Sequence, residues 1–322
     1  MPDRAAAIAG FLDAAGWGAA RHAPLAGDAS ARRYRRLMLG GATAILMDAD
    51  GDAAGTAAFD RLARWLCAAG FSAPRVLAAD TAAGLLLLED LGDDLFARVS
   101  DRSPEAAERL YSGAIDMLAA LQRQTPPPGL PAWDAARLGA LTEPFVTDFA
   151  PRAGIDPARA ARVPETMTTL AAALLGPPRV ICLRDVHAEN LVWLPARPGV
   201  AAVGLLDFQD AVLGDPAYDL VSLLCDARRD LPPGLAARMT ARFAAATGAQ
   251  PEPLAAAAAL LSAQRNLRIL GVFARLARSG KPGYLRHVPR VAAHVRAALA
   301  HPALAPLDDA LGPLPEGMAA DA

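Results

Sequence analysis

The sequence predicts an α+β fold in which a small antiparallel sheet is followed by a larger, mostly helical part. Three observations predict it. Short apolar or alternating segments, separated by turn residues, occupy much of residues 20–90. Beyond residue 100, long stretches repeat apolar side chains at helical spacing. Two short apolar runs, 180–183 and 203–206, interrupt these helices, and each ends in a polar cluster. We therefore expect two lobes, residues 1–90 and residues 91–322.

The first lobe begins with a helix and continues with strands. Apolar side chains at helical spacing predict a helix over residues 3–15. Gly16 is expected to end this helix. Residues 25–39 alternate well enough for a hairpin whose turn is Gly27–Ser30. The remaining elements are a strand, a helix and two further strands, within residues 42–50, 56–69, 71–80 and 84–94.

The second lobe contains at least four helical segments. Residues 104–124 carry apolar side chains on one face and predict a long core helix. The proline-rich stretch that follows reads as an internal loop. The next helical segment is interrupted by Pro144 and Pro151. Asp219 opens another helix, and residues 253–278 predict a long helix that is apolar at first and then carries a stripe of arginines.

Composition excludes several classes of protein. Although 53% of the 322 residues are hydrophobic, no uninterrupted apolar run approaches the roughly 18 residues of a membrane-spanning helix. The N-terminus has an acid where a secretory signal needs positive charge. The net charge is −2 and no large basic block occurs, which argues against a nucleic-acid partner. Three separated cysteines indicate buried thiols in a reducing cytoplasm. The sequence carries no signal for an oligomeric state.

The two polar clusters carry a pattern that suits phosphoryl transfer. Asp185 is followed five residues later by Asn190, and Asp207 closes the second apolar run 17 residues after that. Asp185 can orient an incoming hydroxyl and accept its proton, while Asn190 and Asp207 offer the oxygen ligands that Mg²⁺ prefers. We expect residues 180–183 and 203–206 to pair as a hairpin that brings the clusters together.

These clusters resemble the aminoglycoside phosphotransferase and choline kinase family, small-molecule relatives of the protein kinases. Its catalytic loop is similar to LRDVHAEN at 183–190, with Leu183 and Arg184 replacing His and Gly. Its metal motif is similar to LLDFQD, and a further signature is similar to GDPAYDLV at 214–221. The resemblance covers nearly the whole chain. It implies a protein-kinase-like two-lobe fold that binds ATP and Mg²⁺ between a small antiparallel β N-lobe and a larger, mostly helical C-lobe.

Finer phrases resemble one branch of that family, the anomeric amino-sugar kinases. They are GDAS near 27, ILMDAD at 45, LDFQDA at 206 and SLLCDARRD at 222. The branch phosphorylates N-acetylmuramate and N-acetylglucosamine on the C1 hydroxyl in cell-wall recycling. The resemblance therefore implies a small-molecule sugar as the substrate.

The resemblance also implies roles for individual residues. Asp185 would be the catalytic carboxylate, and Asn190 and Asp207 the metal ligands. The others are Gly27 and Ser30 over the ATP phosphates, Glu89 and Leu91 beside adenine, Gln209, Glu143 and Arg228 at the acceptor sugar, and His187 and Asp219 as supports of the catalytic loop. Trp133 and Asp148 could also face the sugar, and Arg228 with Arg229 could meet a lactyl carboxylate.

One departure from the family concerns the third strand. Many members carry a basic residue there that pairs with the ATP phosphates and with a glutamate of the next helix. Here the position falls on Met47, and residues 56–69 contain no glutamate. Arg33 or Arg35 on one face of the preceding strand, or Arg32 on the other, would replace that cation. The alternative interpretation is a solvated edge strand whose charges prevent aggregation.

Three other functions stay open at this point. A kinase for aminoglycosides or amino alcohols would use the same core, but a cationic acceptor needs an acidic or aromatic cage. The chain has only four Trp and four Tyr and no dense acidic cluster in its acceptor region, which argues against both. The missing ion pair favours a nucleotide-binding pseudokinase, whereas the retained Asp185, Asn190 and Asp207 argue against one. A hydrolase has no nucleophile to support it.

Overall fold

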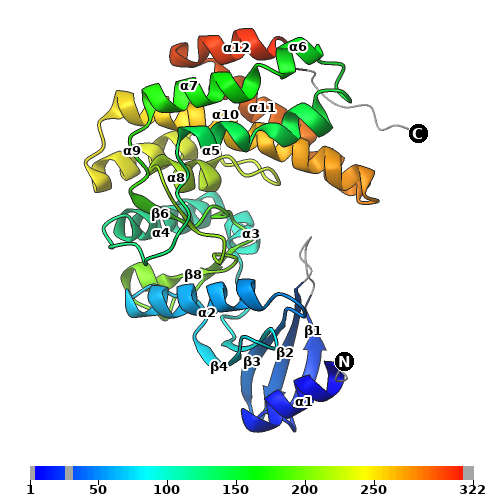
Figure 1. Ribbon diagram of the computed structural model, residues 1–322. Coiled ribbons are helices and arrows are strands. Elements are labelled where there is room, and N and C mark those ends of the chain that lie inside the picture. The colour runs from blue at the N-terminus through cyan, green and yellow to red at the C-terminus, as the bar shows by residue number, and fades with distance from the viewer. Residues whose placement is uncertain (1–3, 26–31, 315–322) are drawn as a thin grey trace. The chain divides into compact units, whose positions relative to one another are not determined.

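The computed structural model describes residues 4–25 and 32–314, which form two compact units (Figure 1). Unit 1 consists of the described residues of Met1–Met117 together with Glu189–Asp210. Unit 2 consists of those of Leu118–Ala188 and Ala211–Ala322. The chain therefore leaves unit 2 after Ala188, contributes a short excursion to unit 1, and returns at Ala211. The division into functional lobes at residue 90 stays a prediction.

Unit 1 contains a five-stranded antiparallel sheet with the strand order β1-β2-β3-β5-β4. Its elements are α1 (Arg4–Ala14), β1 (Arg21–Pro24), β2 (Arg33–Leu39), β3 (Ala42–Asp48), α2 (Ala53–Ala68), β4 (Val76–Asp80), β5 (Leu85–Glu89), α3 (Phe96–Val99), η1 (Ser100–Arg102), β7 (Leu191–Trp193), η3 (Gly199–Ala202) and β8 (Val203–Leu205). Helix α4 (Pro104–Leu121) begins in unit 1, and its last residues belong to unit 2.

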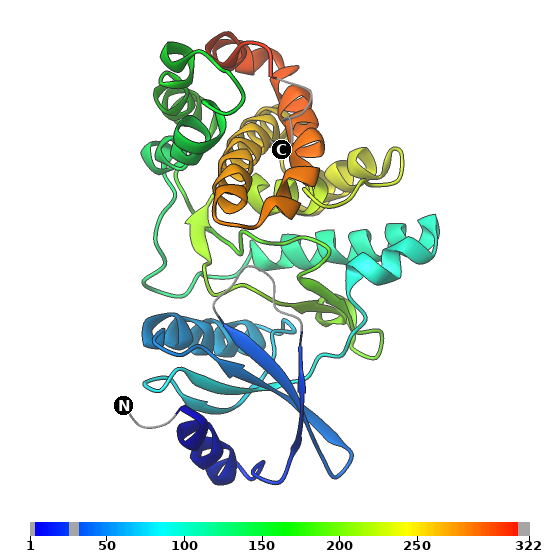
Figure 2. The ribbon, with the colours of Figure 1, turned by 90° about the vertical axis from the view of Figure 1, so that its right-hand side faces the viewer.

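The sheet is built by short turns and one apolar face. Gly40 and Gly41 both have positive φ, which fits the two-residue turn that joins β2 to β3. Residues paired directly across antiparallel strands share a face of the sheet, so Leu37 and Ala44 lie on one side. On that side they pack with Leu46, Leu85 and Leu87 against Ile8 and Leu12 of α1. Figure 2 shows α1, in dark blue, beside the strands of this sheet.

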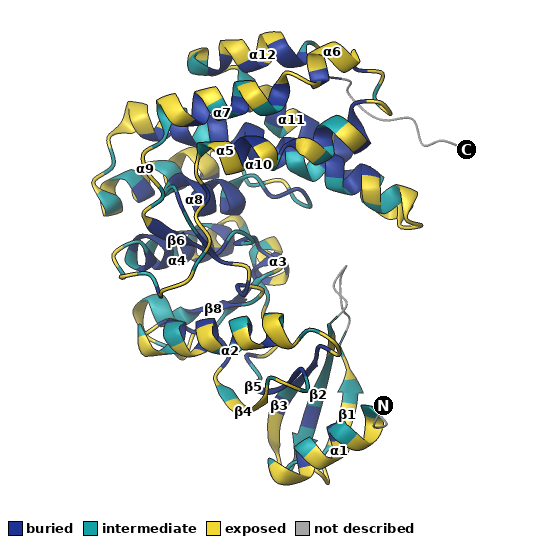
Figure 3. Cartoon of the chain, in the orientation of Figure 1, coloured by how far each residue is buried: buried dark blue, intermediate teal, exposed yellow. Residues whose placement is uncertain are grey.

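Helix α2 begins three residues earlier than the predicted 56–69. The Asp52 side chain accepts a hydrogen bond from the backbone N–H of Gly55, which caps the helix. Phe59, Leu62 and Leu66 are buried, while the opposite side of the helix is exposed (Figure 3). The start of the helix is therefore set by an aspartate that the sequence places just before the apolar period.

The hairpin predicted between residues 180–183 and 203–206 is wrong. Strand β6 (Val180–Cys182) pairs with β9 (Val212–Gly214), whereas β8 pairs with β7. The segment Leu191–Trp193 was not predicted as a strand, yet it lies closer to β8 along the chain than β6 does, and a shorter loop costs less entropy to close. This pairing brings β7 and β8 into unit 1 and leaves β6 and β9 in unit 2.

Contacts within unit 1 hold the β7–β8 hairpin beside the five-stranded sheet. The backbone N–H of Leu205 donates to the carbonyl of Ser72 at 2.9 Å. Arg197, in the loop between β7 and β8, donates to Ser72 Oγ at 2.8 Å and to Glu89 Oε1 at 2.8 Å. Gly204 lets the two strands of the hairpin pack closely, because a Cβ at this position would lie only 3.0 Å from the Cβ of Val192. The hairpin is therefore held by backbone and side-chain contacts to Ser72, in the loop before β4, and by a side-chain contact to Glu89 at the end of β5.

Unit 2 is mostly helical and is organised around one long helix. Its elements are α5 (Ala135–Ala140), the π-helix η2 (Phe145–Phe149), α6 (Pro157–Ala160), α7 (Val163–Leu174), β6, β9, α8 (Ala217–Leu224), α9 (Leu235–Thr247), α10 (Pro251–Arg278), η4 (Pro282–His287), α11 (Val288–Leu299), η5 (Pro302–Leu304) and α12 (Ala305–Leu311). Helix α10 is buried through its middle and packs against α8, α11 and η2. The predicted helix 253–278 is thus confirmed to within two residues at its start.

The predicted α+β class is confirmed, with the antiparallel sheet near the N-terminus and helices dominating the rest. Within the described part of the chain, no helix is both long enough and apolar enough to cross a membrane.

Candidate functional site

The loop that carries Asp185 is fixed from below by a buried carboxylate. Asp219, in the first turn of α8, accepts hydrogen bonds from the backbone N–H groups of Leu183 and Arg184 at 2.7 and 2.8 Å. Ser222 Oγ donates to the Arg184 carbonyl at 2.7 Å. Arg184 has a φ of 74°, a left-handed conformation that costs a non-glycine residue about 1 kcal/mol. These three hydrogen bonds hold the residue before Asp185 in a conformation that it would otherwise avoid.

Asp185 is partly exposed and lies beside a buried arginine. Its carboxylate is 3.6 Å from Nη2 of Arg265, which lies on α10. Burial alone would raise the pKa of Asp185, but the positive charges of Arg265 and Arg184 outweigh it and lower the pKa below its ordinary value. Asp185 therefore stays ionised near neutral pH and can accept a hydrogen bond or a proton.

Arg184, Trp133 and Tyr218 form a cluster of basic and aromatic side chains in the same unit as Asp185. The Arg184 guanidinium lies 4.8 Å from the ring centroid of Trp133, a cation–π arrangement. Trp133 in turn meets Tyr218 edge-on, with ring centroids 5.3 Å apart. Burial raises the pKa of the Tyr218 phenol, while the charges of Arg265 and Arg268 lower it. Both arginines are therefore close enough to Tyr218 to affect its ionisation.

His187 and Arg228 lie near the same loop. The His187 backbone N–H donates to the Asp185 carbonyl at 3.1 Å. Burial lowers the pKa of the His187 ring, Asp226 raises it and Arg228 lowers it further. The Arg228 backbone N–H donates to Asp226 Oδ1 at 2.8 Å. The imidazole is therefore neutral near pH 7, which suits a structural side chain, and the roles predicted for both residues stay predictions.

Asn190 and Asp207 are brought to the same end of the β7–β8 hairpin. The register pairs Leu191 with Leu205, so the residues that flank this pair are neighbours. The Leu206 backbone N–H donates to the Asn190 carbonyl at 2.9 Å, one residue before Asp207. Asp207 has a φ of 55° and, with Arg184, is one of two described non-glycine residues with positive φ. Strained backbone of this kind is concentrated at functional sites.

The donor set at this hairpin end fits magnesium. It offers a carboxylate and an amide oxygen, and Mg²⁺ in kinases is held by few protein ligands together with phosphate oxygens and water. Gln209 Nε2 donates to Asp207 Oδ1 at 2.8 Å, which orients the carboxylate. Across the described ranges, no cluster of three or more His, Cys, Asp or Glu side chains is arranged for a metal.

Glu89, the last residue of β5, and Leu91, two residues beyond it, are the residues of unit 1 predicted beside adenine. The Glu89 carboxylate accepts hydrogen bonds from Arg75 at 3.2 Å and from Arg197 at 2.8 Å. Leu91 is buried, and its Cδ1 would lie 3.2 Å from a Cβ added at Gly204 of β8. The end of β5 and the hairpin that carries Asn190 and Asp207 are therefore in contact within unit 1.

The strand arginines divide between two faces of the sheet. Arg33 and Arg35 share a face with Leu37, which packs against α1. Arg32 lies 3.2 Å from Asp52. Its neighbour Tyr34 occupies the other face, with a pKa that burial raises, Arg32 lowers and Asp207 raises. Arg32 and Asp207 therefore act on the same phenol, whereas the phosphate-binding role predicted for Arg33 stays a prediction.

Met47 is fully buried in β3, opposite Tyr34. The position at which the resembled family carries its basic residue is thus occupied by core packing. Gly27 and Ser30, predicted over the ATP phosphates, lie outside the described residues.

The acceptor-side residue Glu143 precedes the π-helix η2 and is exposed. An added Cβ on Gly271 of α10 would lie 2.1 Å from the carbonyl carbon of Pro144, so this segment lies directly against α10. Asp148, in the π-helix, is buried and accepts hydrogen bonds from Arg275 and Arg278. Asp148 is therefore committed to a structural ion pair, and the role predicted for Glu143 stays a prediction.

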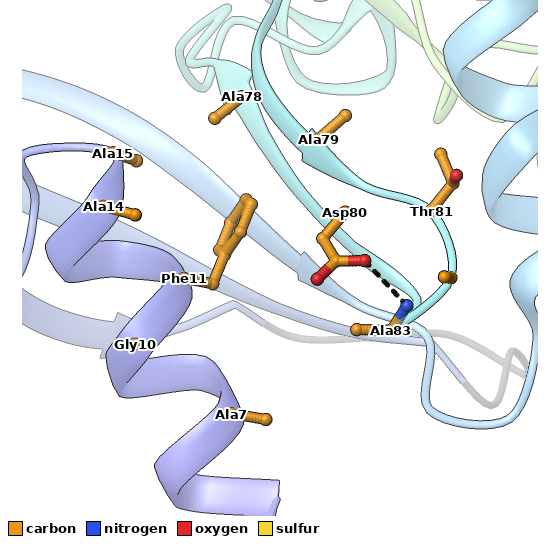
Figure 4. Close-up of a pocket in the computed structure, with 11 residues that line it drawn as sticks. Ala7, Gly10, Phe11, Ala14, Ala15, Ala78, Ala79, Asp80, Thr81 and Ala83 are labelled. Atoms are coloured by element: carbon orange, nitrogen blue, oxygen red, sulfur yellow. Dashed lines mark hydrogen bonds between the residues drawn. The ribbon is translucent and has the colours of Figure 1, made fainter.

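A separate pocket lies beside α1 in unit 1 (Figure 4). Phe11 and several alanines of α1 and of the β4–β5 turn line it, with Asp80 at its edge. Asp80 Oδ1 accepts a hydrogen bond from the Ala83 backbone N–H at 2.9 Å. None of the sequence-predicted site residues lines this pocket, and we assign it no chemistry.

Sequence reasoning missed Arg265 and Arg268. Both were part of an arginine stripe on the predicted helix, which was interpreted as a polar face. The signal that could have identified Arg265 is its surroundings, because residues 260–267 of α10 are all buried. An arginine inside such a stretch must have a partner, since burying an unpaired charge is costly.

Comparison with protein families matches residues 21–261 to the phosphotransferase enzyme family. The chain belongs to this family. An N-acetylmuramate/N-acetylglucosamine kinase of Caulobacter vibrioides is 40% identical over 90% of each chain. A kinase of the same description from Pseudomonas aeruginosa is 35% identical over 88% of this chain and 86% of its own.

A solved structure extends the family assignment to the fold. The crystal structure of a choline/ethanolamine kinase family protein from Mesorhizobium loti matches with a TM-score of 0.61. That match covers 95% of this chain and 97% of the other at 18% identity. The family resemblance and the kinase-like fold predicted from the sequence are confirmed.

We expect activity to fall as the pH drops through about 6, because burial raises the pKa of Asp219 to about 6. Protonation weakens its hold on the backbone of Leu183 and Arg184, while Asp185, with its lowered pKa, stays ionised. The folded pKa is above the unfolded value, so this group makes the fold more stable, not less, as pH falls through the window. Protonation of Asp219 therefore does not unfold the protein, and unfolding is not the cause of the expected loss of activity.

The measurement is kcat between pH 5 and 8, with the thermal midpoint recorded at each pH. The side chain in Asp219→Asn cannot titrate. The kcat of this variant should be lower than that of wild type at all pH values and should not show the acid limb, which is the further fall in kcat below about pH 6. An acid limb that persists unchanged in the variant would contradict this assignment.

Proposed function

We propose that the protein is an ATP-dependent kinase that phosphorylates the anomeric C1 hydroxyl of N-acetylmuramate, of N-acetylglucosamine, or of both. The family assignment supports phosphoryl transfer, and the two curated relatives support the sugar. The observation that carries the proposal is the ionised Asp185 beside Arg265, on a loop braced by Asp219. Such a carboxylate can act on a hydroxyl acceptor.

Asp185 would orient the acceptor hydroxyl and take its proton as the bond to phosphorus forms. An ionised, partly exposed carboxylate is required for this, and the charges of Arg265 and Arg184 keep it ionised. The two hydrogen bonds from the backbone of residues 183 and 184 to Asp219 limit the motion of the loop. Positioning of this kind supplies much of the rate enhancement in phosphoryl transfer.

Asn190 and Asp207 would hold Mg²⁺, which when bound neutralises negative charge on the phosphates of ATP. Gln209 would keep the Asp207 carboxylate oriented through the hydrogen bond to Oδ1. We further propose that the segment Glu89–Leu91 meets adenine and that Gly27, Ser30 and Arg33 meet the phosphates. Since the chain has three free cysteines and would use ATP, we infer that it works in the cytoplasm.

A coupled ADP-release assay tests the proposal. Mg-ATP is supplied with N-acetylmuramate, N-acetylglucosamine, an aminoglycoside or choline, and ³¹P NMR identifies any phosphorylated product. We expect turnover on at least one N-acetyl sugar, with the phosphate on C1. The control omits the acceptor and measures background ATP hydrolysis.

Other outcomes separate the alternatives. Turnover on the aminoglycoside or choline alone would keep the phosphotransferase and reject the sugar. Bound ATP without turnover on any acceptor would point to a nucleotide-binding pseudokinase, a reading that the buried Met47 in β3 would then support.

A further inference from the structure

Three guanidinium groups of unit 2 act on the carboxylate of Asp185. Arg265 is the nearest, at 3.6 Å. Arg184 precedes Asp185 in the chain and lies over Trp133. Arg268 follows Arg265 by one turn of α10, where residues at this spacing share a face. Asp219 is a second carboxylate that acts on Arg265. Two carboxylates do not balance three guanidinium groups, so this region carries an excess of positive charge.

Arg268 is the member of this group that acts on Asp185 and Tyr218 through charge alone, without direct contact. No hydrogen bond or ion pair to its side chain is found within residues 4–25 and 32–314. Burial lowers its pKa most, Tyr218 and Asp185 raise it, and the charges of Arg184 and Arg265 lower it further. The side chain is nevertheless partly exposed, so a ligand can reach it. A partly desolvated guanidinium without a carboxylate is what an anion-binding site requires when its ligand is absent.

The arginines further along α10 show that this lack of an ion pair is specific to Arg268. Arg275 and Arg278 both donate to the buried carboxylate of Asp148. Arg275 follows Arg268 by two helical turns and therefore lies on a similar face. Asp148 already accepts two guanidinium groups, and no ion pair joins it to Arg268. The arginines at the end of the helix are therefore paired with a carboxylate, whereas Arg268, one turn after Arg265, forms no ion pair with a described residue.

We propose that Arg268 binds a carboxylate on the acceptor sugar and so makes the site selective for an acidic amino sugar such as N-acetylmuramate. This inference rests on the proposed function and names a residue that determines specificity within it. Asp185 would receive the reacting hydroxyl, and Arg268 would receive an anionic substituent elsewhere on the ring. Arg184, held over Trp133, adds positive charge to the same region.

The spacing along α10 suits a substituent that is several bonds from the reacting oxygen. Arg268 lies three residues after Arg265, which corresponds to about 4.5 Å along the helix axis. The lactyl carboxylate of N-acetylmuramate is attached through the oxygen on C3, two ring carbons from the C1 hydroxyl. N-acetylglucosamine has a neutral hydroxyl in that place and cannot form a charge-assisted hydrogen bond there.

The test compares kcat/KM for the two sugars in wild type, Arg268→Ala and Arg268→Lys. We expect Arg268→Ala to lower the N-acetylmuramate to N-acetylglucosamine ratio of kcat/KM by about 10- to 100-fold, as loss of a charged hydrogen bond predicts. Arg268→Lys should restore part of the ratio, since it keeps the charge without the planar fork. The methyl ester of N-acetylmuramate lacks the negative charge. Its kcat/KM should therefore be similar for wild type and Arg268→Ala.

Arg275→Ala is the matched control, because this arginine lies on the same helix but is paired with Asp148. It should leave the ratio unchanged. Equal losses on both sugars in Arg268→Ala would assign the arginine to the transferred phosphate and overturn the proposal, as would a ratio that changes in Arg228→Ala but not in Arg268→Ala. Wild type active on N-acetylglucosamine alone would overturn this inference and leave the proposed function standing. Activity on neither sugar would overturn both.

Discussion

Asp185→Asn should reduce kcat by about 100- to 10,000-fold, the range that removal of a general base produces. The asparagine amide has nearly the same shape but cannot accept a proton at neutral pH. Because Asp185 is ionised beside Arg265, the substitution removes a charge that the acceptor hydroxyl would use. It removes no proposed magnesium ligand, so the affinity for Mg-ATP should change little. The measurement is steady-state kcat together with calorimetric titration of ATP in the presence of Mg²⁺.

Asp134→Asn provides a matched control for this substitution. Asp134 is exposed, belongs to the same unit and caps α5 by accepting a hydrogen bond from the Arg137 backbone N–H. Asparagine caps helices about as well as aspartate, so both the thermal midpoint and kcat should stay near wild type. Near-wild-type turnover in Asp185→Asn would reject Asp185 as the catalytic carboxylate. Lost ATP binding in that variant would instead indicate that the loop had lost its structure.

The local part of this site could be predicted from the sequence because its signals are short-range. The spacing of Asp185 and Asn190, and of Asp207 after an apolar run, appears in any reading of the chain. Asp219 lies 34 residues beyond Asp185, yet the GDPAYDLV phrase identifies it through the family resemblance. Its contacts with the backbone of Leu183 and Arg184 are those that a supporting carboxylate needs.

The errors and omissions arose where pairing is decided by tertiary contacts. Residues 180–183 and 203–206 are both short, apolar and buried, and nothing in their periodicity indicates a partner. Ser72 and Glu89, far away in the sequence, hold the β7–β8 hairpin in unit 1. Arg265 lies 80 residues after Asp185, and only the packing of α8 against α10 brings it near. Residues that pair at long range have no characteristic separation in the sequence, so their pairing cannot be predicted from spacing.

Asp207→Ala should lower kcat by about 100- to 1000-fold and raise the Mg²⁺ concentration needed for half-maximal activity. A metal's stabilisation of developing charge is worth several kcal/mol, and each 1.36 kcal/mol corresponds to about tenfold in rate. Asn190→Ala should show the same direction with a smaller loss, since a neutral amide oxygen binds Mg²⁺ more weakly than a carboxylate. Kinetic titration with Mg²⁺ and water-proton relaxation with Mn²⁺ measure the two effects separately.

Asp210→Ala is the matched control, because this exposed aspartate lies three residues beyond Asp207 in the same unit. Its Mg²⁺ titration should overlay that of wild type. The Gln209 amide donates to Asp207 Oδ1, so Gln209→Ala should shift the Mg²⁺ titration less than Asp207→Ala does, and in the same direction. An Asp207→Ala enzyme with an unchanged Mg²⁺ requirement would move the metal away from the end of the β7–β8 hairpin. The positive φ at Asp207 would then have to be explained by packing alone.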